Sequence, residues 1–137
     1  MITPEFLHGW AQRLSQFTGG SCAEAAACLG VKLGDETALV PPQGALSAKL
    51  VDGPSDSTDF FYVELQLEPP GLTLAQLQPV LGAGKTLPRT GAFAAYHHVF
   101  ELDFAGSPSF AYVTATFRAN PKQGAASTSV SVRRGSR

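Results

Sequence analysis

Residues 71–82 read GLTLAQLQPVLG, and residues 19–30 read GGSCAEAAACLG. Both segments have Gly first and last, a hydroxyl residue third, Ala fifth, Glu or Gln sixth and Leu eleventh, without a gap, at an offset of 52 residues. A hydroxyl residue followed three places later by Glu or Gln is the pattern of a capping box, which satisfies free N–H groups at the start of a helix. The Leu-Gly pair then ends the helix. The sequence therefore predicts two short helices and an internal repeat.

Alternating apolar and polar residues follow each of these segments and predict two half-buried strands after each helix. The strands are expected at 46–50, 61–68, 100–104 and 111–117. Residues 60–63 (FFYV) and 110–113 (FAYV) also correspond, at an offset of 50 residues. Thr128, Val130 and Val132 indicate a last short strand. The chain therefore repeats helix–strand–strand twice and closes with a strand.

A longer helix is predicted near the start of the chain. Thr3-Pro4-Glu5 supplies an N-cap, a first-turn proline and an acid near the positive end of the helix dipole. One apolar stripe runs along this helix and consists of Phe6, Trp10, Leu14 and Phe17. Because strict alternation leaves one face of a sheet polar, the expected fold is α+β: an N-terminal helix followed by two αββ repeats, an antiparallel sheet, and helices packed on one face.

The length and composition indicate one folded domain over residues 1–137. Within it we expect a first αββ repeat at 19–70, a second at 71–120 and a basic C-terminal strand or tail at 121–137. Hydrophobic residues make up 44% of the chain and charged residues 15%, which excludes wholesale disorder. No apolar run approaches the ~18 residues that cross a bilayer. The opening has no basic segment typical of a signal peptide, so we expect a cytoplasmic protein as written, or a periplasmic one if the chain has been trimmed.

Charge is distributed unevenly along the chain. Residues 1–103 hold eleven acidic and five basic groups, whereas residues 104–137 hold five basic groups and no acidic ones. The five basic residues are Arg118, Lys122, Arg133, Arg134 and Arg137. They are sparse and lack interleaved aromatic residues, so nucleic acid is not an expected partner. A solvated strand end, or attraction to the acidic part of the same chain, explains them better.

Two motifs resemble catalytic or metal-binding patterns. Gly84-Lys85-Thr86 matches the end of a phosphate-binding loop, but the earlier glycine of that pattern is replaced by Pro79, and a helix precedes it where a strand is required. His97 and His98 are adjacent on a predicted strand, so their side chains should point to opposite faces of the sheet and cannot share a metal ion. Neither motif predicts a nucleotide or metal site.

The remaining reactive residues also indicate no chemistry. Cys22 and Cys28 lie six positions apart, about 240° around a helix, so neither a disulfide nor a metal pair is expected and small buried thiols are the simpler interpretation. Glu101 and Asp103 share a strand face about 7 Å apart, a spacing found in paired carboxylates, but a solvent-facing pair is the better interpretation. We expect no catalytic residues, no metal and no cofactor.

Residues 71–82 resemble the G-[ML]-T-x-x-[QE]-[VL]-x-x-x-[LF]-G opening of SmpA/OmlA (BamE-like) domains. The duplicated arrangement over 19–119 is similar to that of β-lactamase inhibitor proteins, whose tandem repeats carry this opening twice and form one sheet. The resemblance implies short capped helices on an antiparallel sheet, and a domain that binds proteins without chemistry of its own. Pro79 departs from the pattern, because it predicts a kink or an early end of the second helix. No inhibitory residue is carried over.

The leading hypothesis from the sequence is therefore a non-catalytic protein-binding module, either an accessory of envelope assembly or a neutraliser of the inhibitor or immunity type, present as a monomer or homodimer. Tyr and Arg are the residue types most often energetic at interfaces, and the polar face of the sheet should carry the site. The predicted partner-binding residues are Tyr62, Glu64, Gln66, Tyr112, Thr114 and Arg118. The loops at 31–44 and 83–96 are the alternative location. A dimeric secretion chaperone built on the first helix, and a small-molecule-binding or enzymatic α+β domain, are the alternative functions.

Overall fold

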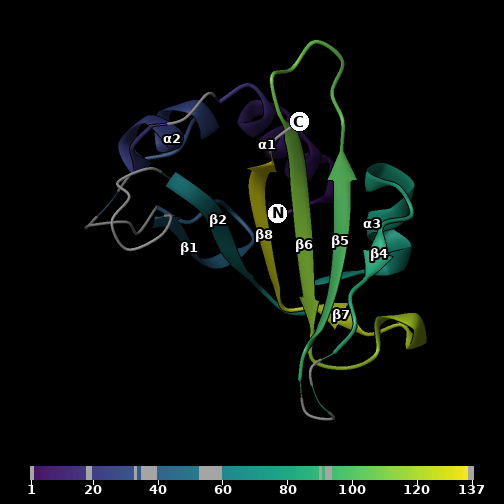
Figure 1. The fold of residues 1–137 in the computed structure, drawn as a ribbon. Coiled ribbons are helices and arrows are strands. Elements are labelled where there is room, and N and C mark those ends of the chain that lie inside the picture. Colours follow the sequence, from purple (N-terminus) through teal and green to yellow (C-terminus); the bar gives the residue numbers. More distant parts are fainter. Residues whose placement is uncertain are drawn as a thin grey trace.

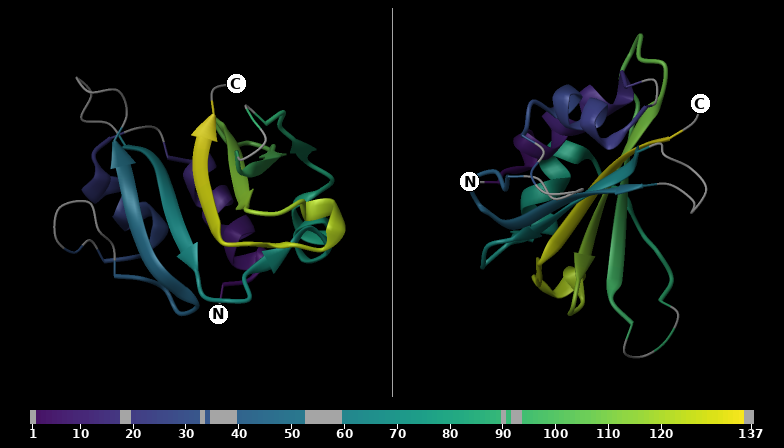
Figure 2. Two further views of the ribbon diagram at one scale, coloured as in Figure 1. Left: turned by 90° about the horizontal axis from the view of Figure 1, so that it is seen from below. Right: turned by 90° about the vertical axis from the view of Figure 1, so that its left-hand side faces the viewer.

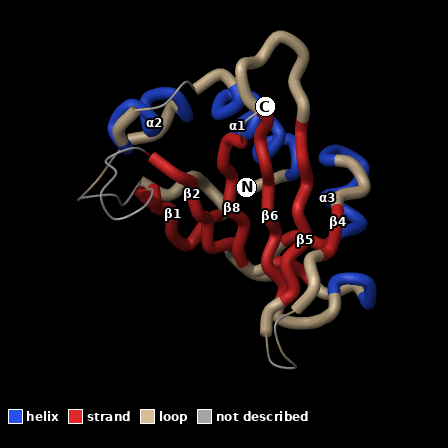
Figure 3. The backbone as a smooth tube through the Cα atoms, viewed as in Figure 1, coloured by secondary structure: helices blue, strands red, loops and turns tan. Residues whose placement is uncertain are grey.

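The computed structural model describes residues 2–17, 20–32, 34, 40–52, 60–89, 91 and 94–135. Gly19, Arg137, the side chain of Phe61 and parts of the two predicted loops lie outside the described residues. In chain order the elements are α1 (Pro4–Ser15), α2 (Cys22–Leu29), β1 (Ala45–Asp52), β2 (Phe60–Leu67), β3 (Leu72–Thr73), α3 (Leu74–Leu81), β4 (Lys85–Thr86), β5 (Tyr96–Leu102), β6 (Phe110–Phe117), the 3₁₀ turn η1 (Pro121–Gln123), β7 (Ala126–Ser127) and β8 (Ser129–Gly135) (Figure 1, Figure 3).

Six strands form one sheet in the order β1-β2-β8-β6-β5-β4, and β3 pairs with β7 in a separate ribbon. Every pairing is antiparallel. The hairpins β1–β2 and β5–β6 come after α2 and α3 along the chain, and the short strand β4 lies between α3 and β5. The two hairpins do not pair with each other, because β8 lies between them. The C-terminal strand is therefore a central strand of the sheet (Figure 1).

The helices α1, α2 and α3 lie on the same side of the sheet (Figure 2). α1 packs against β6 and β8 and also contacts α2 and α3, while α2 packs against β1. The buried side chains of this layer and of the inner sheet face form one core, whose largest members are Phe100, Phe117, Leu7, Leu14, Leu29, Leu50, Leu65, Leu77, Val63, Val113, Val130 and Val132. The predicted α+β architecture, with an antiparallel sheet and helices on one face, is confirmed.

Both predicted capping boxes are present. The Glu24 amide donates to Ser21 Oγ at 3.3 Å, and the Ser21 amide donates back to Glu24 Oε1 at 3.4 Å. At α3 the Gln76 amide donates to Thr73 Oγ1 at 3.3 Å, and the Thr73 amide donates to Gln76 Oε1 at 2.9 Å. These bonds satisfy N–H groups that have no partner inside the helix, which explains why both helices begin at these positions.

The helix ends are fixed by short contacts. Gly30 ends α2 in the left-handed region, with φ of 75°, and Arg13 Nη1 donates to Leu29 O at 2.7 Å, which fastens α1 to the end of α2. α3 does not stop at Pro79 but continues to Leu81. The Gly82 amide donates to Gln78 O at 2.9 Å and closes its last turn, so the proline removes only its own N–H group from the helix.

The C-terminal strand is fastened to the rest of the chain from two sides. Val132 is buried between Val63 on β2 and Val113 on β6. Val130 is buried between Leu65 on β2 and Ala115 on β6. Arg134 Nη1 donates to Phe17 O at 2.8 Å, beyond the end of α1. Within the described ranges, no helix is long and apolar enough to cross a membrane.

Candidate functional site on the open face of the sheet

None of the described helices covers the face of the sheet that is turned toward the viewer in Figure 1. We call it the open face. The strand registers align its side chains in three rows. The first row is Val51, Tyr62, Arg133, Tyr112 and Glu101; the second is Lys49, Glu64, Ser131, Thr114, Val99 and Lys85; the third is Ser47, Gln66, Ser129, Thr116 and His97.

The first row holds an arginine between two tyrosines. Arg133 on β8 is in register with Tyr62 on β2 and with Tyr112 on β6. Its guanidinium carbon lies 4.4 Å from the centroid of the Tyr112 ring, a cation–π contact. A Cβ atom at Gly135 would overlap the Tyr112 ring, so the glycine leaves the space that this ring occupies. The row therefore presents two half-buried tyrosines and a stacked cation.

The second and third rows are linked by polar contacts. Lys49 Nζ lies 3.6 Å from Glu64 Oε2, and Gln66 Nε2 donates to Glu64 Oε1 at 3.3 Å. His97 Nδ1 and Thr116 Oγ1 are 3.1 Å apart. A shallow groove of about 240 Å³ runs between these rows and is lined by Tyr62, Glu64, His97, Thr114, Thr116, Ser129, Val130 and Ser131.

A larger hollow lies where the open face meets the edge strand β4. Its volume is about 500 Å³, and it is lined by Leu81, Gly82, Ala83, Gly84, Lys85, Leu87, Val99, Glu101, Tyr112 and Arg133. We call it the edge hollow. The connection from α3 to β4 forms one wall, and side chains of the first two rows form the floor. Arg133 and Tyr112 thus belong to both the tyrosine row and the edge hollow.

Five of the six predicted partner-binding residues lie on the open face: Tyr62, Glu64 and Gln66 on β2, and Tyr112 and Thr114 on β6. β8 separates the two groups and brings Ser131 and Arg133 between them. Arg118 is exposed but lies just after the last residue of β6. Arg133 was not among the predicted site residues. The alternation of Val130 and Val132 could have indicated that it faces away from the core.

The two histidines have opposite environments, as predicted for neighbours on a strand. His97 is exposed on the open face, whereas His98 faces the core and is 4% exposed. His98 Nε2 donates to Ala83 O at 2.8 Å, and Nδ1 accepts from Thr86 Oγ1 at 2.8 Å. His98 therefore fastens β4 and the preceding loop to β5. Over the described part of the chain, no group of three or more His, Cys, Asp or Glu side chains could hold a metal ion.

The two cysteines are free thiols. Cys22 is buried, and Cys28 is half-buried with Sγ donating to Arg13 O at 3.3 Å. Burial raises the pKa of the Cys28 thiol above its usual value of 9.0, and the nearby charge of Arg13 offsets part of that rise. The thiol is therefore mostly protonated near neutral pH, which makes it a poor nucleophile.

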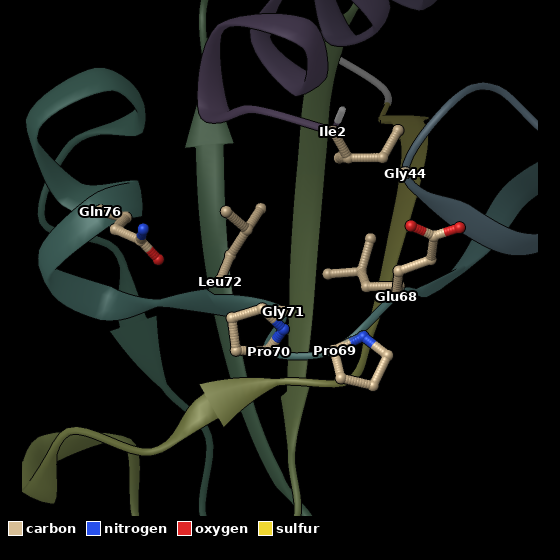
Figure 4. Close-up of a pocket in the computed structure, with 9 residues that line it drawn as sticks. Ile2, Gly44, Glu68, Pro69, Pro70, Gly71, Leu72 and Gln76 are labelled. Carbon is tan, nitrogen blue, oxygen red and sulfur yellow. The ribbon is translucent and has the colours of Figure 1, made fainter.

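A smaller hollow of about 170 Å³ lies on the helix side, between the start of the chain and the β2–β3 connection (Figure 4). Its apolar lining comes from Ile2, Leu67, Leu72 and the two prolines Pro69 and Pro70, and Glu68 and Gln76 lie at its sides (Figure 4). It is small beside the pockets of about 300–1,000 Å³ that hold most small ligands.

Comparison with protein-family models, curated protein sequences and solved structures gives no match to this chain.

Proposed function

We propose that this chain is a non-catalytic protein-binding module and that the open face is its binding surface. The observation that carries the proposal is the row Tyr62–Arg133–Tyr112, which spans three adjacent strands on the face that the helices leave uncovered. Tyr and Arg dominate the energetics of protein interfaces, because they bury a large area and keep a polar tip that a partner can satisfy. The other members of the three rows supply the polar surroundings that such anchors usually have.

The motif at 71–82 supports the same proposal. Its resemblance to SmpA/OmlA (BamE-like) domains and to β-lactamase inhibitor proteins suggests a protein that acts by binding. We propose an accessory of envelope assembly or a neutralising inhibitor or immunity protein. Some polar groups of the open face contact each other, as in the pairs Lys49–Glu64 and His97–Thr116, an arrangement that suits recognition more than catalysis.

The packing of α1 bears on the alternative of a chaperone that dimerises through this helix. Of its apolar stripe, Trp10, Leu14 and Phe17 are buried within the chain, and Phe6 is half-buried. An apolar stripe that is already largely covered offers little further area to a second copy. The proposal therefore places the partner on the open face, and not on α1.

Site-specific photocross-linking in extract from the native organism tests this proposal. A benzophenone amino acid replaces His97, which is exposed on the open face, and the matched control carries it at Gln12, which is exposed on α1. We expect one discrete protein adduct from position 97 and none of the same mass from position 12. Adducts from position 12 alone, or the same adducts from both positions, would contradict the proposal.

A further inference from the structure

The edge hollow combines two cations with one carboxylate. Arg133 reaches it from β8 and Lys85 from β4, while Glu101 lies on β5. Among the residues that the structure describes, neither Lys85 nor Arg133 has a carboxylate within 4.0 Å. The ion pair between Lys49 and Glu64 lies outside the hollow. The hollow therefore keeps an excess of one positive charge that none of the described carboxylates neutralises at contact distance.

The guanidinium of Arg133 is held in place before any partner arrives. It is stacked 4.4 Å from the Tyr112 ring centroid, and Nη1 makes a long hydrogen bond of 3.5 Å to Arg134 O. The Tyr112 ring in turn occupies the space left by Gly135. A stacked guanidinium loses less freedom on binding, and its planar fork matches the two oxygens of a carboxylate.

The rest of the edge hollow is largely apolar. Leu81 and Val99 contribute to its lining, and Leu87 is 40% exposed at the edge strand. Gly82, Ala83 and Gly84 add a wall without long side chains. Apolar surface beside a charged group lowers the local dielectric and strengthens a charge-assisted hydrogen bond. Such a site suits an acidic side chain that has an apolar neighbour.

We propose that the edge hollow binds a carboxylate side chain from an acidic, leucine-containing segment of a protein partner. Arg133 receives the carboxylate through paired N–H donors, Lys85 adds a second positive charge, and the apolar lining takes the neighbouring side chain. This inference rests on the proposed function, since it names the chemistry of the partner at one end of the open face.

The test is a titration of the ¹⁵N-labelled full chain with a capped peptide, acetyl-Gly-Leu-Glu-Glu-Leu-Gly-amide, followed by NMR. We expect saturable shifts of the backbone amides of Lys85, Glu101 and Arg133, and of the Arg133 Nε–Hε signal. The same peptide with Gln in place of Glu should bind at least about tenfold more weakly, since it loses a charge-assisted hydrogen bond. Equal binding of both peptides, or no shifts with either, would overturn the inference.

Three variants locate the effect. Arg133→Gln and Lys85→Gln should each weaken binding of the acidic peptide, and the exposed Lys85 provides a change that does not disturb the Tyr112 stack. Lys122→Gln, at an exposed position of η1, is the matched control outside the edge hollow and should bind as the unaltered chain does. An equal loss of peptide affinity in all three variants would indicate a nonspecific charge effect and overturn the inference. Tighter binding of a short oligothymidylate than of the acidic peptide would also overturn it.

The cross-linking and the titration fail independently. A discrete adduct from position 97 together with no peptide binding at the edge hollow would refute the acidic-segment inference and leave the open face as the binding surface. Adducts from position 12 alone would refute the proposed function, whatever the peptide does.

Discussion

Replacing a buried valine of the C-terminal strand β8 by alanine should lower the unfolding free energy as much as the same replacement in the middle of the core. Val132 is 0% exposed and lies in register between Val63 and Val113, which are also 0% exposed. Val132→Ala removes two buried methyl groups, worth about 1.6 kcal/mol by transfer, and the cavity raises the loss of unfolding free energy to about 2–3 kcal/mol. For a chain of this size that loss lowers the melting temperature by roughly 6–9 °C.

The assay is urea denaturation. If the slope of the unfolding free energy against urea concentration is the same in both proteins, the shift of the midpoint reports a change in stability. The matched control is Val40→Ala, the same substitution at a residue that is 56% exposed, where a loss below about 0.5 kcal/mol is expected. Equal midpoints for the two variants would refute the reasoning, because residues 129–135 would then behave as a tail and not as a central strand.

Further predictions concern the caps, the tyrosine ring and the thiol. Ser21→Ala and Thr73→Ala should each lower the unfolding free energy by about 0.5–2 kcal/mol, and unchanged melting of both variants would mean that the capping contacts are not formed. Gly135→Ala should displace the Tyr112 ring and change its NMR ring-proton shifts, which stay constant if the glycine has no such role. Burial raises the pKa of the Cys28 thiol in the folded chain. The contribution of this thiol to the unfolding free energy is therefore complete below its pKa in the unfolded chain, and it is lost as the pH rises through its pKa in the folded chain. The stability difference between the unaltered chain and Cys28→Ala should therefore narrow above about pH 9, and a constant difference would contradict this.

The helix starts and the half-buried strands could be predicted because the sequence patterns that indicate them involve only residues close together in the chain. The capping box at Ser21 fixes a helix start within a few residues, and strict alternation over 111–117 identifies a half-buried strand. Both signals depend only on neighbours along the chain. They also indicate which face of each strand is buried, so five of the six predicted partner-binding residues lie on the open face.

The neighbours of each strand could not be predicted in the same way. Val130 and Val132 indicate a strand, but the same pattern suits an edge or a central position, and only the pairing with β2 and β6 decides between them. This is why Arg133 was missed as a site residue. Arg118 follows the last buried residue of β6, and alternation alone cannot show that the strand ends there.

The central claim is that the open face binds the partner. It is tested most directly by measuring the affinity of the Tyr62→Ala variant for the cross-linked partner together with the melting temperature of that variant. The matched control is Tyr96→Ala, since Tyr96 is half-buried, packs against the core and lies under Arg89. If the open face binds the partner, Tyr62→Ala should weaken affinity by about 2 kcal/mol, roughly 30-fold, with the fold intact. Tyr96→Ala should lower stability alone. Loss of stability without loss of affinity in Tyr62→Ala would contradict the claim and move the site to the loops at 31–44 and 83–96.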